Sequence, residues 1–128
     1  MTLMDLEADG MTIADAAQAT GLSVHTLRYY ERAGLMLDRV RRASSTHRRY
    51  SADDIAWVHF LTRLRSTGMP IRRVREYADM VRAGEGNESE RLALLEQHRA
   101  DVLAQMAEMQ RHLEAINCKI DIYREGIG

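Results

Sequence analysis

The sequence has little of several residue types, and each shortage excludes a class of protein. Its single cysteine, Cys118, cannot form an intramolecular disulfide, which favours a reducing compartment. No apolar run approaches the roughly 18 residues that a membrane-spanning helix needs. The N-terminus is acidic and lacks the basic flank of a signal peptide. We therefore expect a soluble, cytoplasmic protein with no membrane partner.

Sequence features of an enzyme are also missing. The chain has no glycine-rich phosphate loop, no nucleophile motif and no set of metal ligands at a regular spacing. Aromatic residues make up only 5% of its 128 residues, so the core must be mostly aliphatic. We expect one small domain with an appendage, no catalytic activity, no metal site and no cofactor.

The net charge of −1 hides an uneven distribution of charge along the chain. Residues 12–84 carry thirteen arginines against seven acidic residues, a net charge of +6. Residues 85–128 carry five basic against nine acidic residues, a net charge of −4, and residues 1–11 add −3. A basic front and an acidic rear would orient the molecule toward a polyanion. The excess of arginine over lysine favours phosphate and guanine contacts, although a GC-rich genome would explain it equally well.

Residues 12–32 predict two short helices joined by a tight turn, a geometry that reads DNA. Thr12 and Ser23 are suited to cap the two helices, and Gly21 ends the first. In the second helix, apolar positions recur every three residues, at Val24, Leu27 and the ring of Tyr30, and predict the inward face. An ordinary surface helix with a solvated face is the alternative. The opposite, polar face carries His25, Thr26, Arg28, Tyr29 and Arg32.

A basic hairpin is predicted to follow. Residues 39–42 read RVRR and residues 48–50 read RRY, on either side of the polar segment 43–47. Five arginines between positions 39 and 49 would repel one another unless an anion lay among them. A wing that grips phosphates is therefore favoured over a flexible basic loop.

Two further helices are predicted before a boundary. Ser51 is suited to cap the third, with Asp54 at the capping-box position, and Gly68 ends it. Pro70 lies where the fourth begins, followed by a basic patch of Arg72, Arg73 and Arg75. The turn at residues 83–87 contains two glycines and marks the end of this region.

From residue 88 to residue 124 the pattern becomes a heptad repeat, with no proline or glycine. A helix of about 37 residues is roughly 55 Å long and cannot bury its stripe against a domain of about 70 residues. A second copy of the chain is the simplest partner, giving a two-fold dimer. Arg99 is the one misfit in the stripe. The apolar seam positions are Leu92, Leu95, Val102, Met106, Met109, Leu113, Ile116, Ile120 and Tyr123.

Three blocks together resemble the DNA-binding domain of the MerR family of bacterial transcription regulators. They are SVHTLRYYERAGL, HRRYS and DDIAWVHFLTRLRSTGMPIRRVREY, and the resemblance runs from about residue 12 to residue 84. It implies an all-α dominated fold with a small β-hairpin wing: a winged helix-turn-helix domain followed by a long dimerisation helix in an antiparallel coiled coil. The expected division is a disordered acidic tail at 1–11, the DNA-binding domain at 12–84 and the dimerisation helix with a short tail at 85–128.

The resemblance also implies a function. A homodimer would bind an inverted repeat in double-stranded promoter DNA and regulate RNA polymerase by distorting the DNA between promoter elements, in the cytoplasm of a bacterium at its nucleoid. A coiled-coil adaptor whose basic domain binds nucleic acid or acidic proteins non-specifically is the alternative. The residues expected to contact DNA are Ser23, His25, Thr26, Arg28, Tyr29, Tyr30, Arg41, Arg48, Arg49, Tyr50, Arg65, Arg72 and Arg73.

The sequence does not identify an inducer. Metal-sensing members of the resembled family carry at least two cysteines near the end of the long helix, so one cysteine argues against thiolate metal binding. Cys118 lies two residues after the seam residue Ile116, and it is a candidate redox or electrophile sensor or simply a small surface residue. An organic effector would have to bind near Trp57, Tyr77 and Met80, which are equally well explained as packing residues.

Overall fold

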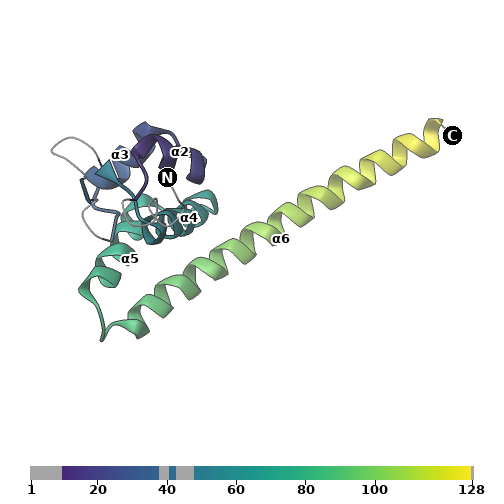
Figure 1. Cartoon of the computed structure of the whole chain (residues 1–128). Coiled ribbons are helices and arrows are strands. Elements are labelled where there is room, and N and C mark those ends of the chain that lie inside the picture. Colours follow the sequence, from purple (N-terminus) through teal and green to yellow (C-terminus); the bar gives the residue numbers. More distant parts are fainter. Residues whose placement is uncertain (1–9, 38–40, 43–47, 128) are drawn as a thin grey trace. The chain divides into compact units, whose positions relative to one another are not determined.

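The computed structural model describes residues 10–37, 41–42 and 48–127 (Figure 1). The chain divides into two compact units, Met1–Arg91 and Leu92–Gly128, and each is described by itself. The N-terminal unit contains four complete helices among the described residues and the first residues, from Glu88, of a fifth. The C-terminal unit is a single helical segment.

The first two helices form the predicted helix-turn-helix. Helix α2 (Ile13–Thr20) is capped by Thr12, whose hydroxyl accepts from the Asp15 amide at 3.1 Å. Gly21 ends it with φ of 74°, a left-handed conformation that costs glycine little because it has no Cβ. Helix α3 (Val24–Arg32) begins three residues after Gly21. Both helix positions and the glycine turn are therefore confirmed.

The next two helices begin where the sequence predicts. Helix α4 (Ala52–Ser66) has a full capping box, in which the Ser51 amide donates to Asp54 at 2.8 Å and the Asp54 amide donates to the Ser51 hydroxyl at 3.1 Å. Helix α5 (Ile71–Ala83) follows Pro70, which occupies its N-cap position. Gly84 then ends α5, as expected from the turn at residues 83–87.

The core of the N-terminal unit joins these helices. Trp57 of α4 is only 9% exposed, and its indole Nε1–H donates to the Leu35 carbonyl at 2.8 Å. Its ring stacks on Tyr77 of α5, with centroids 5.8 Å apart and an angle of 12°. A buried indole that is both packed and hydrogen-bonded fixes the loop after α3 against α4. The fully buried side chains are Ala16, Leu27, Leu35, Tyr50, Val58, Leu61, Val74 and Ala78.

The N-terminal unit also contains two short strands and an isolated bridge. Strand β1 (Arg41–Arg42) pairs antiparallel with β2 (Arg48–Arg49). The loop of the predicted hairpin, residues 43–47, lies outside the described residues, so its role as a wing stays a prediction. Met11 forms a bridge with Tyr50 through two backbone hydrogen bonds of 2.8 Å. Assigning Met11 to a disordered tail was therefore wrong, because its backbone groups are paired.

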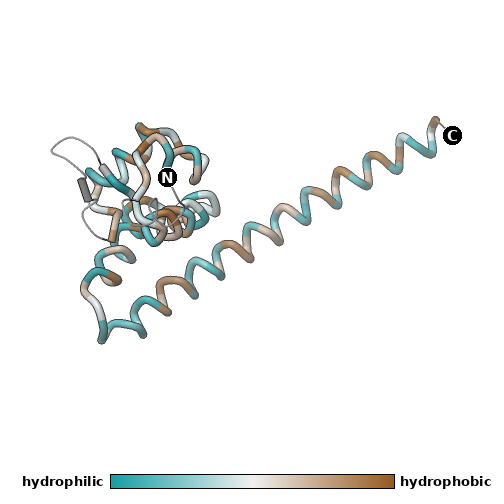
Figure 2. The backbone as a smooth tube through the Cα atoms, in the orientation of Figure 1, coloured by the Kyte–Doolittle hydropathy of each residue, from teal (hydrophilic) through white to brown (hydrophobic). Residues whose placement is uncertain are grey.

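Helix α6 (Glu88–Ile127) contains 40 residues and extends the predicted helix by three residues. Apolar and polar segments alternate along it (Figure 2). Its apolar seam continues to Ile127, which is 87% exposed and was not predicted. Leu95 and Val102 are half-buried. The exposed seam side chains are Leu92, Met106, Met109, Leu113, Ile116, Ile120 and Tyr123.

Length and hydropathy together rule out a membrane-spanning helix in the part of the chain that the structure describes.

Candidate nucleic-acid interface

Helix α3 presents one polar face and buries the other. Leu27 is fully buried and Tyr30 is 6% exposed, as the three-residue spacing predicts. His25, Arg28, Tyr29 and Arg32 are exposed, and their spacing of three, four and seven residues places them on one side of the helix. We call these four residues the polar face of α3. The face combines cations, an imidazole and a phenol, groups that suit phosphates and base edges.

The start of α3 is held by its own cap. The Ser23 hydroxyl accepts from the Thr26 amide and donates to the Thr26 hydroxyl, each at 3.0 Å. Both were predicted to contact DNA, and the structure gives both a capping role as well. Ser23 is exposed and Thr26 is half-buried, so they remain at the surface.

Two tyrosines predicted to contact DNA lie in the core instead. Tyr50 is fully buried, and its hydroxyl donates to the carboxylate of Glu31 on α3. Tyr30 is nearly as buried. This burial does not fit a direct contact between either ring and DNA. Because Tyr50 follows β2 directly and also pairs with Met11, it links the strands to α3.

The predicted arginines of α4 and α5 differ in their surroundings. Arg65 is exposed, but its Nη1 donates to the Met69 carbonyl at 2.9 Å and so bridges the turn between the helices. Arg73 forms an ion pair with Glu76 at 2.9 Å. Arg72 is exposed. Of the strand arginines, Arg49 is half-buried, and the side chains of Arg41 and Arg48 lie outside the described residues.

One arginine that the sequence did not single out connects residues that lie far apart in the chain. Arg82 of α5 donates through Nη1 to the carbonyls of Gly34 and Met36, at 2.7 and 2.6 Å. Its Nη2 also pairs with the carboxylate of Asp79. No local pattern could have indicated these contacts, because the partners lie 46 and 48 residues away.

Among the residues that the structure describes, the candidate sensor and effector residues do not belong to a group that could hold a metal ion. Cys118 is exposed. In the described ranges, no three histidine, cysteine, aspartate or glutamate side chains come close enough to hold a metal ion. Trp57 and Tyr77 pack against each other, as the packing interpretation predicts. A role for any of these residues in sensing stays a prediction.

Comparisons with known proteins give one consistent result. Residues 11–81 match a family described as MerR HTH family regulatory protein, and residues 55–117 match one described as MerR, DNA binding. A relative in Haemophilus influenzae, described as an HTH-type transcriptional regulator, is 34% identical over 114 residues, covering 89% of this chain and 84% of the relative.

Solved structures agree with the sequence matches. A MerR family transcriptional regulator from Listeria monocytogenes aligns with a TM-score of 0.84 and 32% identity over 89% of this chain and 86% of that one. HiNmlR, a MerR family regulator lacking the sensor domain and bound to promoter DNA, aligns with a TM-score of 0.81 and 33% identity over the same shares.

Proposed function

Because the chain belongs to the MerR family of helix-turn-helix regulators, we propose that it binds an inverted repeat in promoter DNA as a homodimer. Family membership makes it a DNA-binding transcriptional regulator. Its relatives are regulators and not enzymes, and we extend that to this chain. The observation that carries the proposal is the polar face of α3, which is exposed along its whole length.

The polar face of α3 reads base edges in the major groove in this proposal. Residues near the start of a recognition helix approach the bases first, which assigns His25, Thr26 and Arg28 to base contacts. Arg28 has the planar fork that pairs with two acceptors of guanine. Tyr29 and Arg32 then lie closer to the backbone of the duplex. Ser23 fixes the start of the helix through its cap.

Phosphate contacts come from the arginines outside α3. Arg41, Arg48 and Arg49 belong to the hairpin, which acts as a wing on the DNA backbone. Arg72 is free to reach a second stretch of backbone from α5, and Arg65 and Arg73 support it with their remaining donors. Tyr30 and Tyr50 hold α3 and the strands in place from the core.

The exposed seam of α6 supports dimerisation. Large apolar side chains recur along it over about 35 residues and are 41–87% exposed from Met106 onward. A row of this length on a polar helix is energetically costly to leave in water and is suited to a matching row. The partner is a second copy in an antiparallel coiled coil, as the family implies, and this coil sets the separation of the two recognition helices. Arg99 is the single charged residue among the predicted seam positions, and it pairs with Glu96 at 3.7 Å.

Regulation follows from the geometry of the dimer. A fixed separation between the two recognition helices bends and untwists the DNA between them, which changes how RNA polymerase engages the promoter. This activity belongs in the bacterial cytoplasm, at the nucleoid. An inducer would act by changing that distortion, either as a small organic molecule or through oxidation or alkylation of Cys118.

The test is selection of duplexes from a random-sequence pool by the full-length protein. We expect an inverted repeat with a two-fold symmetric footprint. Inserting about five base pairs, half a helical turn, between the half-sites should weaken binding strongly because the coil fixes their separation. Arg28→Ala should relax the preference at one position per half-site, whereas Arg72→Ala should weaken all sequences alike. An asymmetric selected motif, or indifference to the insertion, would contradict the proposal.

A further inference from the structure

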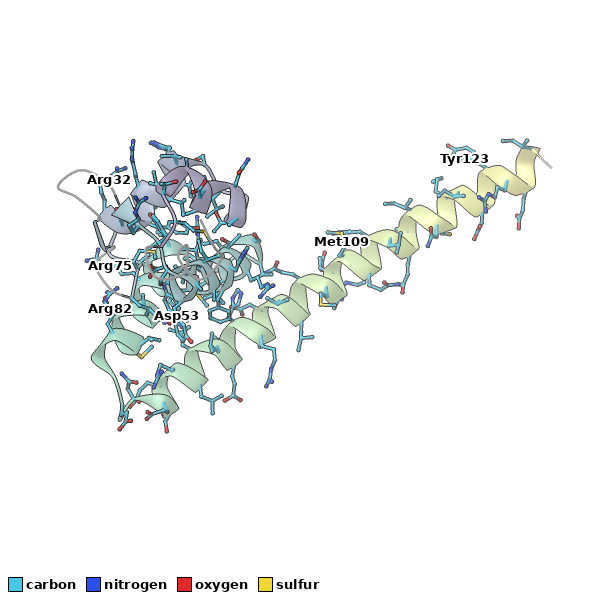
Figure 3. The ribbon with its side chains drawn as sticks, viewed as in Figure 1. Arg32, Asp53, Arg75, Arg82, Met109 and Tyr123 are labelled. Atoms are coloured by element: carbon cyan, nitrogen blue, oxygen red, sulfur yellow. The ribbon has the colours of Figure 1, made fainter. Side chains whose placement is uncertain are left out.

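Arg82 of α5, labelled in Figure 3, joins parts of the N-terminal unit that lie far apart in the sequence. Its guanidinium donates to the carbonyls of Gly34 and Met36 and pairs with the carboxylate of Asp79, one turn earlier on α5. The carboxylate restricts the guanidinium to one orientation, in which a single planar group spans two carbonyls. Such an arrangement is more rigid than an exposed ion pair along one helix.

The two carbonyls belong to the turn that ends the recognition helix. Gly34 has φ of 75°, and the Leu35 amide folds back to donate to the Tyr30 carbonyl at 3.0 Å. A cation at this position also complements the negative end of the α3 dipole. Arg82 therefore fixes the C-terminal end of the helix whose polar face we assign to DNA.

A second arginine of α5 lies against the same turn. A Cβ placed on Gly34 would come within 3.8 Å of Nε and Nη2 of Arg75, so this guanidinium passes directly beside the glycine backbone. Arg75 and Arg82 are seven residues apart and share one side of α5. The C-terminal end of α5, where Arg82 lies, is also tied to the following turn, because Asn87 Nδ2 donates to the Met80 carbonyl at 2.8 Å.

We propose that Arg82 and Asp79 form a clamp that sets the angle between α5 and the recognition helix, and so determines sequence preference without touching DNA. Arg82 is a positioning residue in this proposal. Since the clamp links α5 to α3, a rotation of α5 is passed to the polar face of α3. The effect on preference rests on the site-specific binding proposed above.

The test compares Arg82→Met with a matched control, Arg111→Met. Arg111 pairs with Glu108 three residues earlier, as Arg82 does with Asp79, but on the exposed surface of α6. Each full-length variant is titrated with the duplex selected by the wild-type protein and with a scrambled duplex of the same composition. We expect the ratio of the two affinities to fall about tenfold for Arg82→Met and to stay unchanged for Arg111→Met. Asp79→Asn should lower the ratio in the same direction while keeping the arginine.

The salt dependence of binding separates positioning from contact. A lost phosphate contact reduces the slope of log K against log salt by about 0.9. Arg82→Met should keep the wild-type slope, whereas Arg72→Ala should show the reduced slope. A reduced slope for Arg82→Met would make Arg82 a phosphate contact and overturn the proposal. An unchanged affinity ratio would overturn it as well, because Arg82 would then only stabilise the fold.

Amide hydrogen exchange of the free protein tests the clamp without DNA. The amides of Ala33 and Leu35 donate to the backbone carbonyls of Tyr29 and Tyr30. Both amides should exchange several-fold faster in Arg82→Met than in wild type. Amides of α2 should change little. Equal exchange at Ala33 and Leu35 in both proteins would overturn the clamp, whatever the selection finds. Failure to select any site, with faster exchange at these amides, would instead count against the proposed function alone.

Discussion

Met109→Asp on α6 is the sharpest test of the dimer. Met109 lies near the middle of the apolar seam, is 69% exposed and stands out from the helix in Figure 3. In a two-fold dimer each substitution occurs twice, so its cost is doubled. Burying one large apolar side chain is worth about 1.5–3 kcal/mol. Since Met109 is 69% exposed in the single chain, a dimer can cover about two-thirds of each side chain, and replacing both methionines costs about 2–4 kcal/mol.

The carboxylate adds to this cost because it must lose water in the seam. Since about 1.4 kcal/mol corresponds to a tenfold change in Kd, the dimer should dissociate at least a hundredfold more readily. Sedimentation equilibrium over a range of protein concentrations measures this directly. Binding to a selected inverted repeat should weaken in parallel, because a monomer engages only one half-site.

Ala104→Asp is the matched control for Met109→Asp. Ala104 is also exposed on α6, but it lies on the side of the helix opposite the seam. Ala104→Asp introduces the same charge as Met109→Asp and a similar loss of helix propensity. We expect a dimer constant within about threefold of wild type. If both variants dissociated equally, or if neither did, the seam would not be the dimer interface.

Three further predictions concern the N-terminal unit. Trp57→Phe removes the buried hydrogen bond to the Leu35 carbonyl and should cost about 1–3 kcal/mol in urea unfolding. A smaller loss of stability would mean that a water molecule donates to the Leu35 carbonyl in place of the indole N–H. Gly10→Ala forces an alanine to adopt φ of 79° and places its Cβ 3.0 Å from the Tyr50 carbonyl oxygen. Gly21→Ala imposes a similar φ, but nothing lies within 4 Å of the added Cβ. Gly10→Ala should therefore lower the free energy of unfolding more than Gly21→Ala. Equal losses would remove the close contact from the explanation. The backbone amides of Glu88 and Gly86 hold the pKa of the Glu88 carboxyl below its ordinary value of 4.5. Its stabilising effect on the start of α6 is therefore present above pH 4.5 and lost as the pH falls through the lower, folded pKa. An NMR titration of this carboxyl that gave a pKa at or above 4.5 would contradict the assignment.

Signals confined to a few neighbouring residues could be predicted from the sequence. Thr12, Ser23 and Ser51 cap helices because a short hydroxyl side chain satisfies an amide three residues later. Pro70 marks the start of α5, since its missing donor is not needed there. The heptad predicts the length of α6 because its period needs no information from the rest of the fold.

Contacts between distant residues could not be predicted in this way. Nothing near Tyr50 indicates that its hydroxyl binds Glu31, 19 residues earlier, and so the tyrosine was assigned to DNA instead of the core. Met11 was assigned to a tail because three acidic residues precede it and no helical period includes it. Its pairing with Tyr50 depends only on backbone groups, which are the same in every sequence.

Arginine shows why composition alone could not assign the DNA contacts. Arg65 and Arg82 use their guanidinium donors on backbone carbonyls of the protein, and Arg73 pairs with a neighbouring carboxylate. The same rigid fork that suits phosphate also suits a helix terminus, so an arginine-rich unit can use these side chains for either purpose. Exposed arginines such as Arg28 and Arg72 are then the stronger candidates for DNA. Arg82, which is bonded to the turn after α3, instead sets the angle of that helix in the proposal above. Affinity and specificity should therefore respond to different arginines.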